Sequence, residues 1–464
     1  MRTTYRIQLL CFIILLHLSC QAPSSAISTE KNSKVKILTL DPGHFHAALV
    51  QKSMYDAVDT IVHVYAPADS DVDLHLGRIT AYNQRADSPT AWKEIVYTGQ
   101  DFFDKMLQEK KGNVVILAGN NQKKTSYIKH SIDAGFHVLA DKPMAIDRAG
   151  FELLQSAFAT AEQKNLLLYD IMTERYEITT MLQRAFSLQP GIFGQLEKGT
   201  ADNPAVTKES VHYFFKYVSG NVLQRPPWFM DVLQEGEGIV DVTTHLVDLV
   251  QWECFPNETI DYKKDITLVA ARRWSTPMTL SQFGRITRLN AFPAYLKNAV
   301  TKDSTLEVFS NGEISYQLRG VHAKVSVTWG FEAPPGTGDT HHSILRGTSA
   351  NLVIRQGVEQ NHRPALYIEP VGTVTQPYES AVQEALAEIN KEYPGVTVRK
   401  TGAGWEVVIP ESYKEGHEAH FARVMEKFLE YHGNGNMPDW EVPNMIAKYY
   451  LTTAALELAR NPSK

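Results

Sequence analysis

The 464-residue chain has few cysteines: Cys11, Cys20 and Cys254 are the three it contains. Cys11 lies within an amino-terminal apolar segment, so no disulfide framework is expected and stability must come from a hydrophobic core. The chain also lacks a basic run, and its net charge of -6 argues against a nucleic-acid-binding protein. Its hydrophobic content of 43% and charged content of 21% are ordinary for a globular protein. The length favours two domains.

The amino terminus lacks an apolar run long enough to span a bilayer. Arginines precede the apolar residues 7–18, and Ser19-Cys20-Gln21 follows them. This pattern resembles a bacterial lipoprotein signal, in which Cys20 is lipidated and becomes the first mature residue. His17 stands where such signals usually have leucine, so an ordinary secretory signal is the alternative. We expect a signal at residues 1–20, a linker at 21–33, and an exported protein of the cell envelope. It would face the periplasm and touch the membrane only through a lipid anchor.

Apolar segments alternate with helical patterns from residue 35 onward. This alternation predicts a parallel sheet with right-handed crossovers, and therefore an α/β fold whose residues 34–165 form a doubly wound domain; the resemblance described below implies that it is a Rossmann dinucleotide-binding domain. Strands are expected at residues 35–40, 61–65, 113–118, 136–140 and 166–169, and helices at 47–54 and 123–134.

The second half of the chain shows strands joined by short turns. Residues 166–464 are therefore predicted to form an α+β domain with a mostly antiparallel sheet, an extended tail and a terminal helix at 446–460 that returns to the first domain. The strongest hairpin signal is Asn311-Gly312 between two alternating segments, because Asn-Gly suits a type I′ turn. Further strands are expected at 325–329, 350–355 and 365–368.

One lysine stands at the end of a predicted strand. The segment at residues 134–143 reads as the end of a helix, a short apolar strand, and then Asp141-Lys142-Pro143. Pro143 offers no backbone donor and ends the strand, so Lys142 is placed at the carboxyl edge of the sheet. Open α/β sheets bind their ligands at this edge, which makes Lys142 a candidate catalytic residue.

The first strand-to-helix turn lacks most of the usual glycines. Such turns bind a dinucleotide pyrophosphate through closely approaching backbone. Here Gly43 occupies one glycine position, whereas Asp41 and His46 occupy the other two. Pro42 has no backbone donor, and the side chains of His44 and His46 are substitute donors. The alternative is a structural turn that binds nothing, and no acidic residue directly ends the second strand, so NAD and NADP remain equal candidates.

Two segments resemble the Gfo/Idh/MocA family of oxidoreductases. The first comprises residues 118–121 and 134–143, where Asp141-Lys142-Pro143 stands in place of the family's Glu-Lys-Pro. The second is at residues 237–248, where the family has a glycine-rich turn opening a helix that carries an aspartate and, four residues later, a histidine. These are Asp241 and His245, which would share one helix face.

The resemblance implies a Rossmann domain followed by a mostly antiparallel α/β domain, with NAD or NADP as cofactor. It implies that His245 is the acid/base on a sugar hydroxyl, that Lys142 donates to that hydroxyl or relays its proton, and that Asp241 positions substrate. Family members commonly associate through the antiparallel sheet, so a homo-oligomer is also expected. The residues placed nearest the cofactor are Gly43, His44, Phe45, His46, Asn120, Asp141 and Lys142.

Other side chains are weaker candidates. Glu174 and Arg175 follow a predicted strand near the crossing between domains, and Trp228 would stack on a sugar ring, although packing in the core is the alternative. Two histidine clusters lie later, at residues 341–342 and 417–420. The histidines of the second cluster are three apart, which excludes the helical metalloprotease motif. No metal site is predicted, and one assembled from both clusters is the alternative.

Three functions remain open at this stage. The first is a nicotinamide-dependent oxidoreductase acting on a sugar or glycoside hydroxyl, with a tightly held cofactor recycled in place, as resemblance to glucose–fructose oxidoreductase suggests for an exported protein. The second is an NAD-dependent glycosidase that oxidises its sugar transiently. The third is a lipid-anchored carbohydrate-binding protein without cofactor, because fold alone does not fix function.

Overall fold

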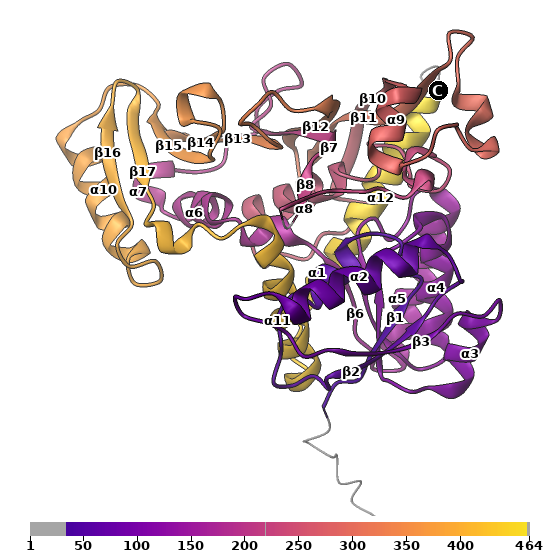
Figure 1. Ribbon diagram of the computed structural model, residues 1–464. Coiled ribbons are helices and arrows are strands. Elements are labelled where there is room, and N and C mark those ends of the chain that lie inside the picture. The colour runs from indigo at the N-terminus through magenta and orange to yellow at the C-terminus, as the bar shows by residue number, and fades with distance from the viewer. Residues whose placement is uncertain (1–33, 219, 462–464) are drawn as a thin grey trace, which may run out of the picture. The chain divides into compact units, whose positions relative to one another are not determined.

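The computed structural model describes residues 34–218 and 220–461 (Figure 1). The predicted signal with Cys20 and the linker to residue 33 lie outside the described residues. No helix in the described part of the chain is both long and apolar enough to cross a membrane.

The first sheet has six strands in the order β3-β2-β1-β4-β5-β6, and each pair of neighbours is parallel. This is the strand order of a Rossmann domain and confirms the predicted doubly wound sheet. The central strands β1 and β4 are fully buried and almost entirely apolar because helices cover both of their faces. The strands are β1 (Ile37–Leu40), β2 (Ile61–Tyr65), β3 (Lys93–Tyr97), β4 (Val114–Leu117), β5 (His137–Asp141) and β6 (Leu168–Ile171). Its helices are α1 (His46–Val50), α2 (Ser70–Gln84), α3 (Phe102–Glu109), α4 (Asn121–Asp133) and α5 (Arg148–Gln163).

Sequence patterns located most of this sheet. The edge strand β3 was not predicted because it is largely exposed and its apolar run is short, from Ile95 to Tyr97. The sheet also extends beyond residue 165, since β6 pairs with β5. The boundary predicted at 165 therefore falls within the first domain, just before its last strand.

The second sheet has nine strands in the order β10-β11-β12-β7-β13-β14-β15-β17-β16. Its neighbours are antiparallel except β12 and β7, so the predicted mostly antiparallel sheet is confirmed. The strands are β7 (Val206–Phe215), β10 (Ile266–Thr279), β11 (Thr305–Leu318), β12 (Val321–Glu332), β13 (Thr340–Arg346), β14 (Ala350–Arg355), β15 (Ala365–Pro370), β16 (Thr397–Thr401) and β17 (Gly404–Val408), and β8 (Tyr217–Val218) pairs separately with β9 (Asn221–Val222).

The helices of the second half are α6 (Ile178–Ser187), α7 (Pro190–Phe193), α8 (Thr243–Cys254), α9 (Leu280–Thr287), α10 (Gln376–Ile389), α11 (His417–Asn434) and α12 (Glu441–Arg460). Short 3-10 helices are η1 (Thr173–Tyr176), η2 (Pro227–Met230), η3 (Ala294–Ala299), η4 (Val358–Gln360) and η5 (Glu411–Tyr413).

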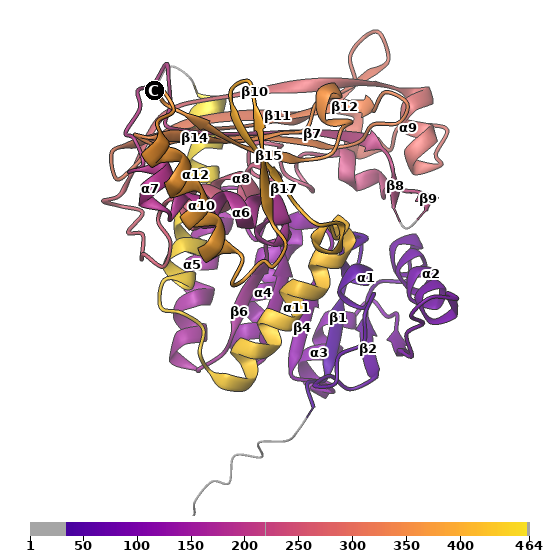
Figure 2. The ribbon, with the colours of Figure 1, turned by 90° about the vertical axis from the view of Figure 1, so that its left-hand side faces the viewer.

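Helices α11 and α12 return to the first domain. Phe421, Met425 and Phe428 of α11 and Tyr449 of α12 belong to the same buried core as the first sheet. Figure 2 shows α11 crossing this domain, while α12 continues toward β10. The predicted return of the terminal helix is therefore confirmed, and the helix unites both sheets.

The hairpin predicted at Asn311-Gly312 is wrong, because both residues lie inside the continuous strand β11. The tight turn lies instead at Arg319 and Gly320, which both have positive φ between β11 and β12. Asn311 uses its side chain to donate to the carbonyl of Trp274 at 3.0 Å and to accept from the backbone N–H of Trp329 at 2.6 Å. The side-chain amide of Asn311 therefore links β11 to both of its neighbours, β10 and β12.

Glycines let the segment before α8 lie directly on β11. A Cβ at Gly312 would be 2.6 Å from the Cβ of Ile239, and a Cβ at Gly238 would be 1.7 Å from the carbonyl oxygen of Ser310. The N–H of Gly238 also donates to the carbonyl of Phe309 at 3.0 Å. This close approach fixes the turn that carries Asp241.

We expect Gly238→Ala to destabilise the protein by about 1–3 kcal/mol, because the added methyl collides with rigid backbone. Gly77→Ala is the matched control: a Cβ at Gly77 meets nothing within 4 Å on the exposed side of α2, so this change should be neutral or slightly stabilising. Urea unfolding midpoints of the two variants provide the measurement. Equal midpoints would show that the turn is free to shift away from β11.

Candidate functional site

A cavity of about 760 Å³ lies at the carboxyl edge of the first sheet. Lys142 follows β5 there, and Asp241 and His245 reach the same cavity from the segment around the start of α8. The structure therefore brings together the three predicted catalytic candidates, which come from segments about a hundred residues apart.

Lys142 and Asp241 form a buried ion pair, with side chains 9% and 8% exposed. Burial alone would lower the pKa of Lys142, but the carboxylates of Asp241 and Asp141 outweigh it and raise that pKa. The predicted placement of Asp241 on a helix is wrong, since α8 begins at Thr243. Asp241 instead belongs to the preceding turn, where its N–H donates to the carbonyl of Glu237 at 3.0 Å.

His245 lies in the first turn of α8, and its buried Nδ1 has no hydrogen-bond partner in the structure. Burial, followed by the nearby charge of Lys142, lowers the pKa of His245 to about 3. The imidazole is therefore neutral at physiological pH.

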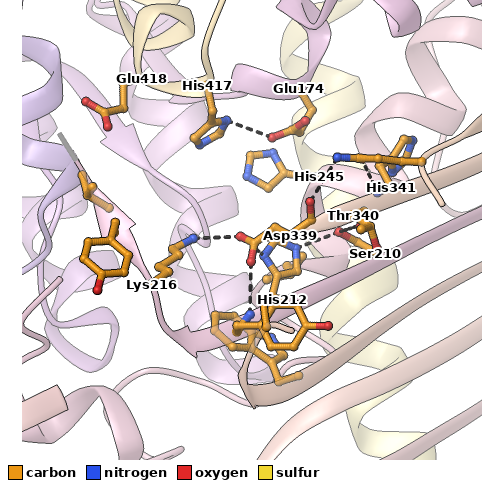
Figure 3. Close-up of a pocket in the computed structure, with 18 of the residues that line it drawn as sticks. Glu174, Ser210, His212, Lys216, His245, Asp339, Thr340, His341, His417 and Glu418 are labelled. Carbon is orange, nitrogen blue, oxygen red and sulfur yellow. Dashed lines mark hydrogen bonds and ion pairs between the residues drawn. The ribbon is translucent and has the colours of Figure 1, made fainter. Parts of the chain in front are cut away.

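Glu174 and His417 form a second acid–base group beside His245 (Figure 3). Their side chains approach to 3.3 Å, from η1 and from the first residue of α11. Burial would raise the pKa of Glu174, but its hydrogen bond with His417 and the neighbouring imidazoles hold that pKa below its usual range. The prediction of Glu174 at the site agrees with its place in the cavity lining. Its pairing with His417 was not predicted, although His417 had been singled out in the sequence.

Arg175 does not line the cavity, so its predicted role in binding substrate is wrong. Its guanidinium is buried on the opposite side of η1, where it binds Asp248 of α8 at 2.7 Å and Glu441 of α12 at 2.9 Å. These carboxylates keep the pKa of Arg175 above its ordinary value despite burial. Arg175 therefore holds elements together rather than contacting a ligand.

His44, Phe45 and His46 line the cavity from the first turn. Nδ1 of His46 lies 2.9 Å from the carboxylate of Asp141, and Nδ1 of His44 lies 3.5 Å from the same oxygen. Burial lowers the pKa of His46 to about 4, whereas the adjoining imidazole and Lys124 keep the pKa of Asp141 below its usual range despite burial. Asp141 thus orients the histidines of this turn.

Trp228 covers Gly43 instead of lining the cavity. A Cβ at Gly43 would lie 2.8 Å from Cζ2 of Trp228, and the indole Nε1 donates to Asp71 of α2 at 2.7 Å. In dinucleotide-binding turns the corresponding glycine leaves room for the pyrophosphate. Trp228 therefore occupies that approach in this conformation, and the predicted stacking on a sugar has no support.

Asn120 also contacts protein rather than the cavity. Its side chain caps α4 by accepting from the N–H of Gln122 at 3.1 Å and donates to Gln234 at 2.8 Å. The neighbouring Asn121 donates to the carbonyl of Glu235 at 2.7 Å. The segment that precedes Asp241 is thereby attached to the edge of the first sheet.

The histidine clusters converge only in part. His341, His417 and His420 all line the cavity, whereas His342 does not. Among the described residues, His44, His46 and Asp141 form the one group whose ligand atoms all lie within 4.8 Å of one another, as a metal site requires. The alternative of a metal site assembled from the two later clusters is therefore not supported by their spacing.

Comparison with known proteins identifies two family models in the chain. Residues 43–169 match the "Oxidoreductase family, NAD-binding Rossmann fold", and residues 182–460 match the "Putative oxidoreductase C terminal domain". No curated protein matches. A crystal structure of a "putative oxidoreductase" from Parabacteroides merdae is 56% identical, with a TM-score of 0.90 over 93% of this chain and 99% of that one.

More distant structures share the fold alone. A biliverdin reductase from Synechocystis, in complex with biliverdin and NADP⁺, is 11% identical with a TM-score of 0.52, covering 91% of this chain and 98% of that one. A 3-ketoreductase from Actinomadura kijaniata, in complex with NADP, is 15% identical with a TM-score of 0.52, covering 91% and 96%. With both domains matched and a majority-identical relative along nearly its whole length, the chain belongs to the Gfo/Idh/MocA oxidoreductase family, in the branch with the oxidoreductase C-terminal domain.

Proposed function

We propose that this protein is a nicotinamide-dependent oxidoreductase that moves a hydride between its cofactor and a hydroxyl-bearing carbon of a sugar or glycoside. The observation that carries the proposal is the meeting of Lys142, Asp241 and a neutral His245 in one cavity at the carboxyl edge of a Rossmann sheet. An alcohol carbon that loses a hydride must also lose its hydroxyl proton. The site offers a base for that proton and a cation beside it.

His245 is the proton acceptor in this proposal. Its pKa of about 3 means that the imidazole is unprotonated at neutral pH, and its unpartnered Nδ1 shows that no protein group competes for one of its nitrogens. Lys142 stabilises the developing alkoxide as a charged donor. Asp241 orients Lys142 and compensates for its buried charge.

The turn at Gly43 accommodates a dinucleotide only if Trp228 withdraws. Beyond Trp228, the turn residues His44, Phe45 and His46 and the strand-end residue Lys142 are the groups that would hold it, with Asp141 orienting the two histidines. When bound, the nicotinamide would exchange the hydride. The proposal extends to an exported, Cys20-anchored enzyme whose cofactor is held tightly, because free nicotinamide nucleotides are scarce outside the cytoplasm. NAD and NADP are equal candidates.

We expect Lys142→Met and His245→Asn each to lower kcat for sugar oxidation by about 10²–10⁴-fold, because each removes a group that acts in proton transfer or charge stabilisation. The measurement is NAD(P)H formation with a panel of sugars and glycosides. Lys391→Met and His130→Asn, at exposed positions away from the cavity, serve as matched controls.

Nucleotide released from the native protein is assayed in parallel. If the protein releases no nucleotide and binds neither NAD nor NADP at millimolar concentration, the proposal fails, and a carbohydrate-binding protein without cofactor becomes the better account.

Asp241→Asn should reduce the free energy of unfolding by about 3–5 kcal/mol at pH 7, because it leaves the buried ammonium of Lys142 without its partner. In the native protein the pKa of Lys142 is raised above its value in the unfolded chain. The stabilisation from the ion pair is therefore present at pH values below the unfolded-state pKa, and it is lost as the pH rises through the folded-state pKa. In the variant that pKa falls, so stability should rise with pH and the difference from the native protein should narrow between pH 7 and 10.

Urea unfolding at several pH values measures this effect. The double variant Lys142→Met/Asp241→Asn is the control, because it removes the unpaired charge and should recover most of the loss. A difference that stays constant with pH would contradict the buried ion pair.

A second candidate function is favoured by the pairing of Glu174 with His417. In a glycosidase that works by transient oxidation, the new ketone acidifies the neighbouring C–H bond. A base must remove that proton while the aglycone leaves, water then adds, and the ketone is reduced again. Glu174 is ionised because its pKa is held low, and it lies beside His245 without belonging to the Lys142 pair.

If this second function holds, Glu174→Gln should abolish release of the aglycone while leaving oxidation of the sugar within about threefold of the native rate, because the amide cannot accept the C–H proton. Product analysis by mass spectrometry distinguishes accumulated ketone from free sugar. Glu152→Gln, at an exposed position on α5, is the control. Equal loss of both activities would instead assign Glu174 to the oxidation step.

A further inference from the structure

We propose that the part of the cavity formed by β7, β8 and the loop before β13 is a second sugar subsite, so that the substrate is a glycoside of at least two sugar rings. This inference rests on the proposed function, because it names the substrate class of the same cavity. Four observations carry it: a second polar group, aromatic side chains beside it, the balance of charge, and the size of the cavity.

The second polar group consists of His212, Lys216 and Asp339. Asp339 accepts from Lys216 at 2.8 Å and from the backbone N–H of Tyr213 at 3.1 Å, and it contacts Nδ1 of His212 at 3.1 Å. Figure 3 shows this group on one side of the pocket, with Glu174 and His417 on the other. The three side chains are 21–29% exposed, so they are held in place by one another and still face the cavity.

Aromatic side chains stand beside this polar group. Tyr213, Phe215 and Tyr217 line the cavity, and Tyr217 is 65% exposed although it is large and partly apolar. The ring of Tyr213 lies against Gly330, where a Cβ would come within 2.9 Å of its Cε1. Aromatic faces next to fixed polar groups match a pyranose ring, whose C–H faces stack while its hydroxyls form hydrogen bonds.

The charge balance favours a neutral ligand. Lys216 and Asp339 neutralise each other at 2.8 Å, so this end of the cavity presents no net charge from the pair. A site for a phosphate or a uronic acid would need a cation with free donors, whereas the other cation at this end, Arg225, directs its guanidinium at the carbonyl oxygens of Phe214 and Tyr213. Paired ions that remain partly exposed instead offer both donors and acceptors, which suits the hydroxyls of a neutral sugar.

The dimensions of the cavity agree with two occupied positions. Its volume of about 760 Å³ lies in the upper part of the range of about 300–1,000 Å³ for small-molecule sites, and it includes the space beside His44, His46 and Lys142 that the proposed nicotinamide would take. Pro334 and Pro335 border the cavity in the loop that ends at Asp339. Within this loop the backbone N–H of Thr337 donates to the carbonyl of Pro334 at 3.0 Å, which forms a turn. A single sugar at His245 would leave the subsite around Asp339 unfilled.

The test compares methyl β-glucoside with cellobiose and methyl α-glucoside with maltose. Steady-state oxidation gives kcat/KM for each, and calorimetry on the double variant Lys142→Met/Asp241→Asn, which leaves no unpaired buried charge at this position, gives dissociation constants without turnover. We expect a disaccharide to bind at least tenfold more tightly than its methyl glycoside.

Tyr217→Ala should reduce this preference by about threefold to tenfold, and Asp339→Asn by about tenfold or more, with both methyl glycosides unaffected. Tyr295→Ala, another exposed tyrosine but outside the cavity lining, should change nothing.

The outcomes separate the subsite from the proposed function. Preferential binding of a disaccharide without any oxidation supports the subsite and defeats the oxidoreductase. Oxidation of mono- and disaccharides with equal kcat/KM, or no tighter binding of either disaccharide, overturns the subsite and leaves the function standing. Phenyl β-glucoside that binds as tightly as cellobiose, unaffected by Asp339→Asn, would also overturn it, because the position would then accept an apolar aglycone.

Discussion

A buried network of charges connects the first sheet to the elements that carry the site. Arg175 of η1 binds Asp248 of α8 and Glu441 of α12. Lys448 of α12 contacts Asp248 and Asp170 of β6, each at 2.7 Å. All five side chains are at most 8% exposed. Replacement of one partner would leave a buried charge uncompensated at a cost of about 3–5 kcal/mol, so each side chain of the network depends on the position of the others. The network therefore fixes β6, η1, α8 and α12 as one unit.

The site is built from the immediate neighbours of such fixed residues. Glu174 precedes Arg175, and His245 lies one helical turn before Asp248 on α8. The same relation holds at the other end of the cavity, where Lys142 directly follows Asp141, the carboxylate that orients His44 and His46. Side chains that face the cavity are thus paired with side chains that hold the backbone, which keeps the reacting groups within a narrow range of positions.

The sequence predicted those parts of the structure that depend on local pattern. Apolar runs located the buried strands, and the lysine before Pro143 marked the sheet edge, because both signals are contained in a few consecutive residues. The errors concern residues whose role depends on distant partners. Asn311-Gly312 has the composition of a turn, but Gly312 is required by contact with Ile239. Arg175 is polar and adjoins the site, but its guanidinium binds Asp248 and Glu441, which are distant in the sequence. His417 likewise meets Glu174 only in the folded chain.

The loss of glycines from the first turn does not by itself remove a dinucleotide site. Asp41 stands where the fingerprint has its first glycine, and it adopts the positive φ of 46° that this position requires, which aspartate tolerates better than most residues. Its carboxylate accepts from Tyr127 at 3.0 Å and lies 3.4 Å from Lys123, so its charge is directed toward α4, and burial raises its pKa. The turn thus keeps a positive φ at this position. Gly43 is covered by the indole of Trp228 from η2 of the second domain and by the carboxylate of Asp71 from α2, which accepts from that indole. Access to the turn therefore depends on the position of these two side chains rather than on the missing glycines.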